Sequence, residues 1–299
     1  MRGIVTGATG FLGSHVADHL AEKGHEITVF DSRPTDRHPH VVGDLLDPDA
    51  LERAFQETDF VCHLAAVGDV YLAAERPALA ASVNVTGTTN VCDAALRAGV
   101  KRIVVASTWE VYGEPHYQPI DEAHPCAPDH PYNITKYGGE LMARSYARLK
   151  HLDIVCLRLG TSFGTRMRPN SVFSIFIRKA LAGEPITIQG SGLQGRQFTH
   201  AKDIGRAFEA ALTKGRPGEV YNIVADRMVT IRELAEIVTS FAPTSLTYGE
   251  ARPGDVRSAT VTSAKAAAEL GWRAVVRFED ALRELVDEAR TMKVSAGPR

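Results

Sequence analysis

The chain has 299 residues, of which 44% are hydrophobic and 23% charged, and its formal net charge is −2. These values are ordinary for a globular protein, and they exclude a strongly basic surface for nucleic acid or for an anionic membrane. Four cysteines are scattered without the spacing of a metal site or a disulfide framework, so we expect reduced thiols and no metal. We find no apolar run of membrane-spanning length and no apolar leader, and therefore expect a cytoplasmic protein.

The first half of the chain alternates short apolar runs with helical patterns, which indicates βαβ units and a parallel sheet. We expect strands at Gly3–Thr6, Glu26–Phe30, His40–Gly43, Asp59–Leu64, Arg102–Ser107 and Asp153–Leu159. We expect helices at Phe11–Lys23, Pro48–Gln56, Ala78–Ala98 and Tyr132–Leu149. The predicted fold class is α/β, with a Rossmann doubly wound parallel sheet.

The second half has a less regular pattern. Helices are predicted at Val172–Ala182, Asp203–Leu212, from Thr230 onward and at Phe278–Ala289, and strands at Ile186–Gln189, Glu219–Ile223 and Leu246–Tyr248. Residues 190–195 read as a glycine-rich turn. Because no linker separates two halves, we expect interleaved lobes: a Rossmann domain at residues 1–160, to which 198–228 returns, and a smaller α/β substrate lobe at 161–197 and 229–299.

The segment at residues 6–13 joins the first predicted strand to the first helix and contains three spaced glycines. Gly7 permits a tight turn, Gly10 lets the backbone approach a pyrophosphate, and Gly13 lets the helix pack closely on the sheet. The free N–H groups of the helix N-terminus then face the phosphates. Asp31, after the second strand, can accept both ribose hydroxyls and repels a 2′-phosphate, which favours NAD over NADP, although Arg33 could instead bind that phosphate.

Tyr132 and Lys136 open a predicted helix and lie one turn apart, so their side chains point to the same side. A free tyrosine has a pKa of about 10, and a neighbouring ammonium lowers it by stabilising the phenolate. Tyr132 can then take a proton from a hydroxyl group while hydride leaves the same carbon. Such a pair is also common on ordinary exposed helices, so its weight comes from the other motifs.

These motifs together resemble the short-chain dehydrogenase/reductases. The opening wording GATGFLGSH, the Tyr132–Lys136 pair and the stretch at residues 106–113, which ends in Val-Tyr-Gly, are similar to the extended branch that contains the NAD-dependent epimerases and dehydratases. The resemblance runs from Gly3 to about Leu285. It implies a retained NAD, a nucleoside-diphosphate sugar as substrate, and a homodimer formed through the helices at 78–98 and 132–149.

The resemblance also implies a set of cofactor contacts along the carboxyl edge of the sheet. These are Gly7, Gly10, Phe11, Leu12, Gly13, Asp31, Ser32, Arg33, Asp44, Leu45, Leu64, Ala65, Ala66, Asn84, Ser107, Tyr132 and Lys136. Asp44 would contact adenine, although a helix cap is an equally simple interpretation. Asn84 would lie near the nicotinamide ribose, and Ser107 would support either the cofactor or the strand end.

The same resemblance assigns the residues around the sugar. Thr108 aligns with the hydroxyl residue that hydrogen-bonds the reacting oxygen, and Glu110 is either a base at C5 or a carboxylate with a local hydrogen bond. Trp109 stands where the dehydratases have an aspartic acid, and an indole cannot donate a proton of that kind. The expected substrate contacts are Thr108, Trp109, Thr161, Arg196 and Arg252, in which Thr161 replaces an asparagine and the two arginines would grip the diphosphate.

The leading prediction is C4 epimerisation through a transient 4-keto sugar, because this reaction needs no additional acid. Dehydration or decarboxylation through Glu110 is the close alternative. An NAD(P)H-dependent reductase of a non-sugar carbonyl is a further one, which Thr161 and Arg33 allow. A non-catalytic dinucleotide-binding protein is disfavoured by the presence of Tyr132, Lys136 and Thr108.

Overall fold

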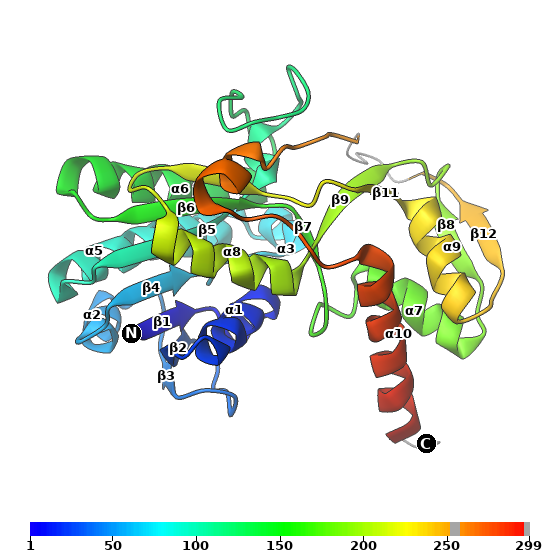
Figure 1. The fold of residues 1–299 in the computed structure, drawn as a ribbon, viewed down its shortest axis with the longest axis horizontal. Helices are drawn as coiled ribbons and strands as arrows, with labels where there is room; N and C mark the ends of the chain where they lie inside the picture. Colours follow the sequence, from blue (N-terminus) through cyan, green and yellow to red (C-terminus); the bar gives the residue numbers. More distant parts are fainter. Residues whose placement is uncertain (252–257, 296–299) are drawn as a thin grey trace.

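The computed structural model describes residues 1–251 and 258–295. Seven parallel strands form the central sheet in the order β10-β6-β5-β4-β1-β2-β3. Figure 1 shows the strands from β6 to β3 side by side. The strands are β1 (Arg2–Thr6), β2 (Glu26–Asp31), β3 (His40–Val42), β4 (Phe60–His63), β5 (Arg102–Thr108), β6 (Ile154–Leu159) and β10 (Val220–Ile223). This order confirms the predicted Rossmann doubly wound sheet.

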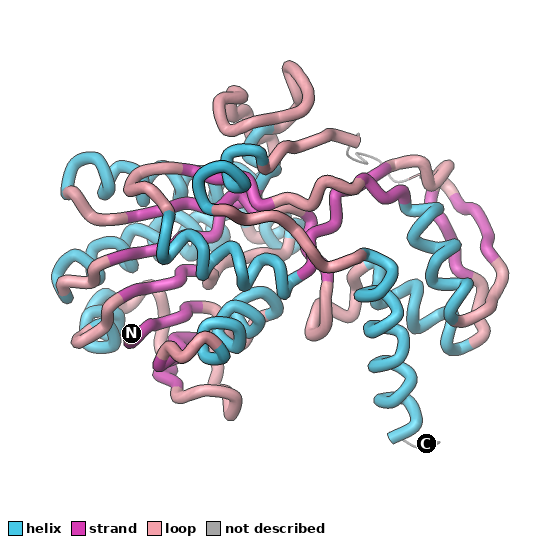
Figure 2. The backbone as a smooth tube through the Cα atoms, viewed as in Figure 1, coloured by secondary structure: helices cyan, strands magenta, loops and turns pink. Residues whose placement is uncertain are grey.

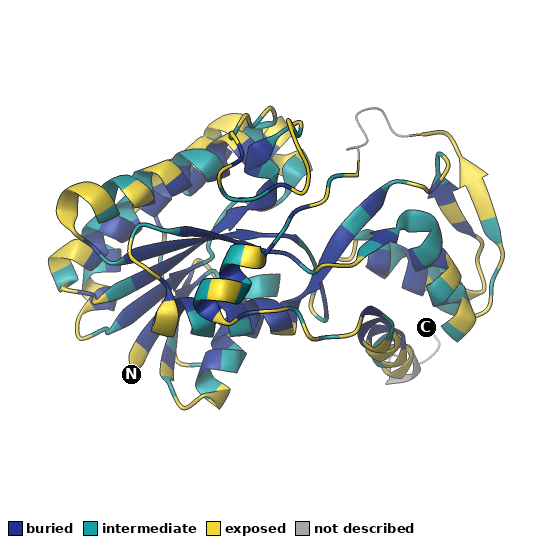
Figure 3. Ribbon diagram, turned by 45° about the horizontal axis from the view of Figure 1, so that its top comes forward, coloured by how far each residue is buried: buried dark blue, intermediate teal, exposed yellow. Residues whose placement is uncertain are grey.

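Helices cover both faces of this sheet (Figure 2). They are α1 (Phe11–Glu22), α2 (Pro48–Phe55), α5 (Thr88–Ala98), α6 (Pro131–Lys150) and α8 (Ala201–Lys214). On one face α1 and α8 pack around buried Val16 and Phe208, and on the other α2, α5 and α6 pack around Leu51 and Val91. With both faces covered, strands β4 and β6 are buried along their whole length (Figure 3), which explains why apolar residues predominate in both.

A smaller lobe lies beyond the carboxyl edge of the sheet, at the right of Figure 1. It contains α7 (Val172–Ala182), β8 (Ile186–Gln189), α9 (Ile231–Phe241), β12 (Leu246–Gly249) and α10 (Phe278–Ser295). Its core is a cluster of phenylalanine rings, in which Phe163 stacks on Phe173 and Phe198 on Phe278, with ring centroids 5.0 and 5.8 Å apart. Phe163 and Phe198 lie on strands that lead from the main sheet into this lobe, so the chain passes between the two lobes at these strands.

Those connecting strands were not predicted from the sequence. β7 (Thr161–Phe163), β9 (Gly195–His200) and β11 (Met228–Thr230) form a three-stranded sheet in the order β11-β9-β7. Each of these strands is too short to show a clear alternation of apolar and polar residues. They also pair with each other across segments that are distant in the chain. The segment 190–195, predicted as a turn, contributes its last residue to β9.

The helix predicted at Ala78–Ala98 is divided in the structure. It consists of α4 (Pro77–Ala81), a π-helical segment at Ser82–Gly87, and α5, and it is preceded by the unpredicted α3 (Val70–Glu75). The π-helical turn carries buried Asn84 inward, and a Cβ at Gly87 would stand 3.0 Å from Leu45 Cβ. π-bulges of this kind often occur at functional sites.

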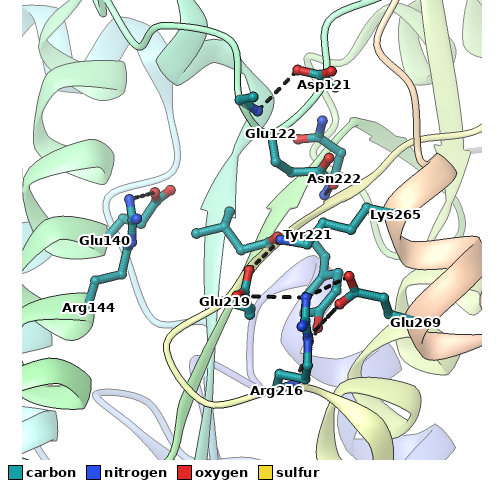
Figure 4. Close-up of polar contacts among 12 residues, drawn as sticks. Asp121, Glu122, Glu140, Arg144, Arg216, Glu219, Tyr221, Asn222, Lys265 and Glu269 are labelled. Atoms are coloured by element: carbon teal, nitrogen blue, oxygen red, sulfur yellow. Dashed lines mark hydrogen bonds and ion pairs between the residues drawn. The ribbon is translucent and has the colours of Figure 1, made fainter.

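A network of polar contacts surrounds the edge strand β10 (Figure 4). The Tyr221 hydroxyl donates to Glu269 at 2.8 Å, and the Arg216 guanidinium donates to the same carboxylate at 2.7 Å. Lys265 donates to Glu219 at 2.6 Å. These contacts hold the segment around the π-helical turn at Ala266–Leu270 against the last strand of the main sheet.

Candidate active site

The glycine-rich turn between β1 and α1 is closed too tightly for any side chain. Gly7 has a φ of 76°, and a Cβ there would stand 2.5 Å from Ala65 N. A Cβ at Gly13 would stand 2.3 Å from Gly7 O. The backbone of the turn therefore packs directly on the segment after β4, and the first-turn N–H groups of α1, which have no intrahelical partners, remain for an anion.

A cavity of about 780 Å³ opens above this turn and follows the carboxyl edge of the sheet from β2 to the start of α6. Every predicted cofactor residue except Asn84 lines it. So do four residues assigned to chemistry or substrate: Thr108, Trp109, Glu110 and Thr161. The sequence motifs thus converge on one continuous cavity.

The β2 end of the cavity carries the two predicted adenosine contacts. Asp31 is buried, and its carboxylate accepts hydrogen bonds from Thr9 N at 3.1 Å and Arg33 N at 3.2 Å. The Arg33 guanidinium donates to the Thr9 hydroxyl at 3.1 Å. Asp44 accepts from Leu46 N at 2.9 Å, so it caps its own turn while also lining the cavity. Both interpretations of Asp44 are therefore compatible with its position.

Asn84 lies behind the cavity wall instead of in it. Its side-chain oxygen accepts from Val67 N at 2.8 Å, and its amide nitrogen donates to Val67 O at 3.2 Å and to Thr135 Oγ1 at 3.0 Å. These bonds tie the loop after β4 to the π-helical segment and to α6. In this structure Asn84 supports the cavity wall, and a direct contact with the cofactor ribose stays a prediction.

Tyr132 and Lys136 stand on the first turns of α6 and face the cavity. α6 begins after His130, whose Nδ1 accepts from Tyr132 N at 3.2 Å. Burial raises the pKa of the Tyr132 phenol, the negative charge of Glu110 adds to this effect, and a hydrogen bond with Thr108 acts against it. Thr108 and Tyr132, which come from β5 and α6, therefore present two hydroxyl groups to the same point.

Lys136 is buried, and its ammonium donates to Ala106 O at 2.7 Å. Burial lowers the pKa of this group to about 8, while the negative charge of Glu140 acts in the opposite direction. The ammonium is thus anchored to the end of β5, one helix turn from the phenol. It remains mostly protonated at neutral pH.

A buried ion pair supports the strand ends beneath this site. The Glu140 carboxylate is fully buried and accepts from Ser107 Oγ at 2.6 Å and from Arg158 Nη2 at 2.6 Å and Nε at 3.1 Å. Arg158 also lies over the ring of Tyr112, 4.7 Å from its centroid. Ser107 therefore lines the cavity but directs its hydroxyl to Glu140, which favours a structural role for it.

Glu110 lines the cavity in a half-buried position. Burial raises the pKa of its carboxyl group, the charge of Arg196 lowers it, and Asp129 raises it. Arg196 lines a small hollow beside the main cavity. Trp109 and Thr161 line both the hollow and the main cavity, so the two adjoin there. The predicted contact Arg252 lies outside the described residues.

Two charged residues that the sequence did not indicate also line the cavity. Asp69 caps α3, with its carboxylate accepting from Tyr71 N at 2.9 Å and Leu72 N at 3.1 Å, and its other oxygen pairs with Arg168. An aspartate at a helix N-cap could have indicated Asp69, but the sequence pattern did not predict a helix at this segment. Arg168 stands on a loop before α7, where no periodicity marks it.

Within the described residues, no cluster of acidic, histidine or cysteine side chains is arranged to bind a metal ion. Among residues 1–251 and 258–295, every helix is too short or too polar to span a membrane.

Comparison with known proteins identifies the family. The family model described as "NAD dependent epimerase/dehydratase family" matches residues 4–224. The chain belongs to this family. It is 33% identical over 304 residues to a dTDP-glucose 4,6-dehydratase of Streptomyces antibioticus, covering 95% of this chain and 91% of the relative.

Solved structures agree with this assignment. A UDP-glucose 4-epimerase of Thermotoga maritima, solved with UDP-glucose, superimposes with a TM-score of 0.92 at 30% identity, covering 98% of this chain and 99% of the other. A UDP-glucose 4-epimerase of Thermus thermophilus, solved with NAD, gives a TM-score of 0.88 at 31% identity, with coverages of 97% and 99%. The recognised resemblance to extended short-chain dehydrogenase/reductases is confirmed.

This epimerase/dehydratase family member is therefore an NAD-dependent enzyme. The cavity fits the cofactor, since the positions at which a Cβ would collide are those that the pyrophosphate-binding turn requires. The Asp31 carboxylate stands at the β2 end, where a ribose would lie. Tyr132 and Lys136 line the same cavity from the start of α6.

Proposed function

We propose that this enzyme inverts C4 of a nucleoside-diphosphate sugar through a transient 4-keto sugar, with NAD retained between turnovers. The proposal is carried by one observation: the hydroxyl groups of Thr108 and Tyr132 are hydrogen-bonded in the wall of the cavity that Asp31 and Lys136 also line. The Lys136 ammonium is fixed there by Ala106 O. This arrangement suits proton removal from a hydroxyl group whose carbon loses hydride.

Each side chain has a separate task in this reaction. Tyr132 takes the proton from the C4 hydroxyl, and Thr108 donates a hydrogen bond to the same oxygen. The Lys136 ammonium stabilises the phenolate. Bound NAD supplies the hydride acceptor and a positive charge near the phenol. When the keto sugar has turned over, Tyr132 returns its proton as C4 is reduced on the opposite face.

Trp109 favours epimerisation over dehydration. Loss of water next to a ketone needs an acid for the leaving hydroxyl as well as a base at C5. The buried Trp109 ring occupies the position next to Glu110, and it offers no titratable proton. Epimerisation needs neither group.

Dehydration or decarboxylation is the second candidate, because Glu110 is half-buried in the cavity wall with a raised pKa. A raised pKa makes the carboxylate a stronger base. Glu110 would then remove the C5 proton of the keto intermediate. The two candidates differ in whether C5 exchanges its hydrogen with water.

We assign the remaining substrate contacts to the lobe boundary. Arg196 and Thr161 line the hollow beside Trp109, and a guanidinium there would bind a diphosphate. The cofactor side is formed by residues 1–160 and 198–228, and the sugar side by 161–197 and 229–299. A homodimer through α5 and α6 is supported by exposed apolar side chains on them, including Leu96, Ile134 and Leu141.

The test is turnover without added cofactor. The purified enzyme should carry NAD(H) and convert one or more of the UDP-, dTDP-, GDP- or CDP-sugars to its C4 epimer, identified by NMR and mass spectrometry. Consumption of one NAD(P)H per turnover would instead establish a reductase. A product lighter by one water or one carbon dioxide would establish dehydration or decarboxylation.

A further inference from the structure

Arg168 places a positive charge at the sugar end of the cavity. Among the described residues, the basic side chains that line the cavity are Arg33, Lys136 and Arg168. Arg33 lies at the β2 end, bonded to Thr9, and Lys136 is buried with its ammonium on Ala106 O. The Arg168 side chain is 54% exposed. It is thus an exposed cationic group in the cavity wall.

Asp69 holds this guanidinium in place. One carboxylate oxygen of Asp69 accepts two N–H groups at the start of α3, and the other pairs with Arg168. Although burial raises the pKa of Asp69, the Leu72 N–H and the charge of Arg168 outweigh it, so the carboxyl remains ionised. A guanidinium has five N–H donors, so it can keep Asp69 and bind a second carboxylate.

The position of Arg168 relative to Tyr132 indicates which part of a sugar it would meet. Arg168, its partner Asp69 and the Tyr132 phenol line the same cavity. The charge of Arg168 also lowers the pKa of that phenol. The C4 hydroxyl of the substrate lies on that phenol in the proposed reaction. The neighbouring C5 carries the C6 substituent, which is a hydroxymethyl group in a hexose and a carboxylate in a uronic acid.

We propose that Arg168 forms a carboxylate subsite and that the preferred substrate is a nucleoside-diphosphate uronic acid. The inference rests on the proposed function, since it takes the C4 hydroxyl to lie at Tyr132. A planar guanidinium binds a carboxylate through two parallel hydrogen bonds, which a hydroxymethyl group cannot reproduce.

The competing source of negative charge is the diphosphate, which every nucleotide sugar carries. If Arg168 binds the diphosphate, its loss weakens neutral and acidic sugars equally. If it binds the C6 carboxylate, its loss weakens uronic acids alone. The comparison of one neutral and one acidic sugar on the same nucleotide therefore separates the two.

The experiment compares wild type, Arg168→Met and Arg168→Lys with UDP-glucuronate and UDP-glucose. We expect the wild type to prefer UDP-glucuronate. Arg168→Met should raise KM for UDP-glucuronate on the order of 100-fold and KM for UDP-glucose by less than about 3-fold. Arg168→Lys should recover part of the loss. Arg166→Met is the matched control, since Arg166 lies on the same loop but pairs with Asp18 of α1.

Equal effects of Arg168→Met on both sugars, or a wild type that prefers UDP-glucose, would overturn the carboxylate subsite. Calorimetry keeps the test independent of turnover, with UDP as the reference ligand. If neither sugar reacts, the proposed epimerisation fails, while tighter binding of UDP-glucuronate that disappears in Arg168→Met still supports the subsite. Loss of binding to UDP itself in Arg168→Met would assign Arg168 to the diphosphate.

Discussion

At the scale of single residues, the site depends on a phenol that burial makes less acidic. The pKa of Tyr132 is raised by burial and by Glu110, so its ionisation needs neighbouring positive charge. The charge of Arg168 acts in this direction, and we propose that the Lys136 ammonium, one turn along α6 and held by Ala106 O, adds to it. Thr108 completes the site from the end of β5. We propose that Tyr132, Lys136 and Thr108 together form the proton acceptor.

The Tyr132→Phe variant tests this arrangement. Removing the hydroxyl removes the proton acceptor but leaves the ring that packs at the cavity wall. Turnover should fall by about 10²–10⁴-fold. Bound NAD(H), measured after denaturation of the purified variant, should match the wild-type content. Full activity in Tyr132→Phe would remove this residue from the mechanism.

The ion pair beneath the site makes a separate prediction. Glu140→Gln leaves the buried Arg158 guanidinium without its counter-charge, and we expect a loss of about 3–5 kcal/mol in unfolding free energy. Arg144→Gln is the control, because Arg144 lies 3.7 Å from the same carboxylate but is 42% exposed (Figure 4). Its cost should be below about 1 kcal/mol in the same denaturant titration. Similar losses in both variants would contradict the distinction.

At the scale of elements, the sequence predicted the strands and helices of the main sheet well. Buried runs such as Phe60–His63, ended by turn residues, have few other interpretations. The short strands β7, β9 and β11 were missed because their pairing depends on residues far apart in the chain. The π-helical turn at Ser82–Gly87 was missed. Such a turn adds one residue to the helix, and this leaves the spacing of apolar residues along the sequence almost unchanged.

The same contrast applies to the site. Residues in motifs, such as Gly7, Asp31 and Tyr132, were predicted to meet and do line one cavity. Arg168 could not be found in this way, because a loop residue reaches the cavity only through the path of the chain after β7. The place of Asn84 behind the wall follows from the loop at Val67, whose path the sequence does not specify.

The loop after β2 is anchored to α1 through Asp18. Burial raises the pKa of Asp18, but hydrogen bonds from Arg166, His38 and Arg37 outweigh it and lower the pKa to about 2. A lowered carboxyl pKa stabilises the fold above the ordinary range for aspartate, and the stabilisation is lost as pH falls toward 2. Asp18→Asn should therefore be less stable at pH 6 and show a weaker dependence of unfolding free energy on pH below 4. An unchanged acid limb in urea titrations would contradict this.

At the scale of the whole molecule, the two lobes are joined by buried polar contacts. The Asp203 carboxylate at the start of α8 accepts from Val275 N at 3.1 Å and Val276 N at 3.0 Å, and the Trp272 indole donates to Asp203 O at 2.9 Å. These bonds fix the segment that leads into α10.

The proposed homodimer makes a prediction at this scale. Ile134 and Leu141 of α6 are exposed in a single chain, at 49% and 46%. If α6 packs against its copy, Ile134→Glu combined with Leu141→Glu should give a monomer in analytical ultracentrifugation. A wild type that already sediments as a monomer would contradict the homodimer.

The central claim is that C4 alone is oxidised and reduced. The most direct measurement is an NMR analysis of product formed in D2O from a nucleotide sugar deuterated at C4. The account predicts the C4 epimer with deuterium still at C4 and protium still at C5. Deuterium at C5, or its loss from C4, would contradict epimerisation with retained cofactor and would favour proton removal by Glu110 or exchange of the cofactor.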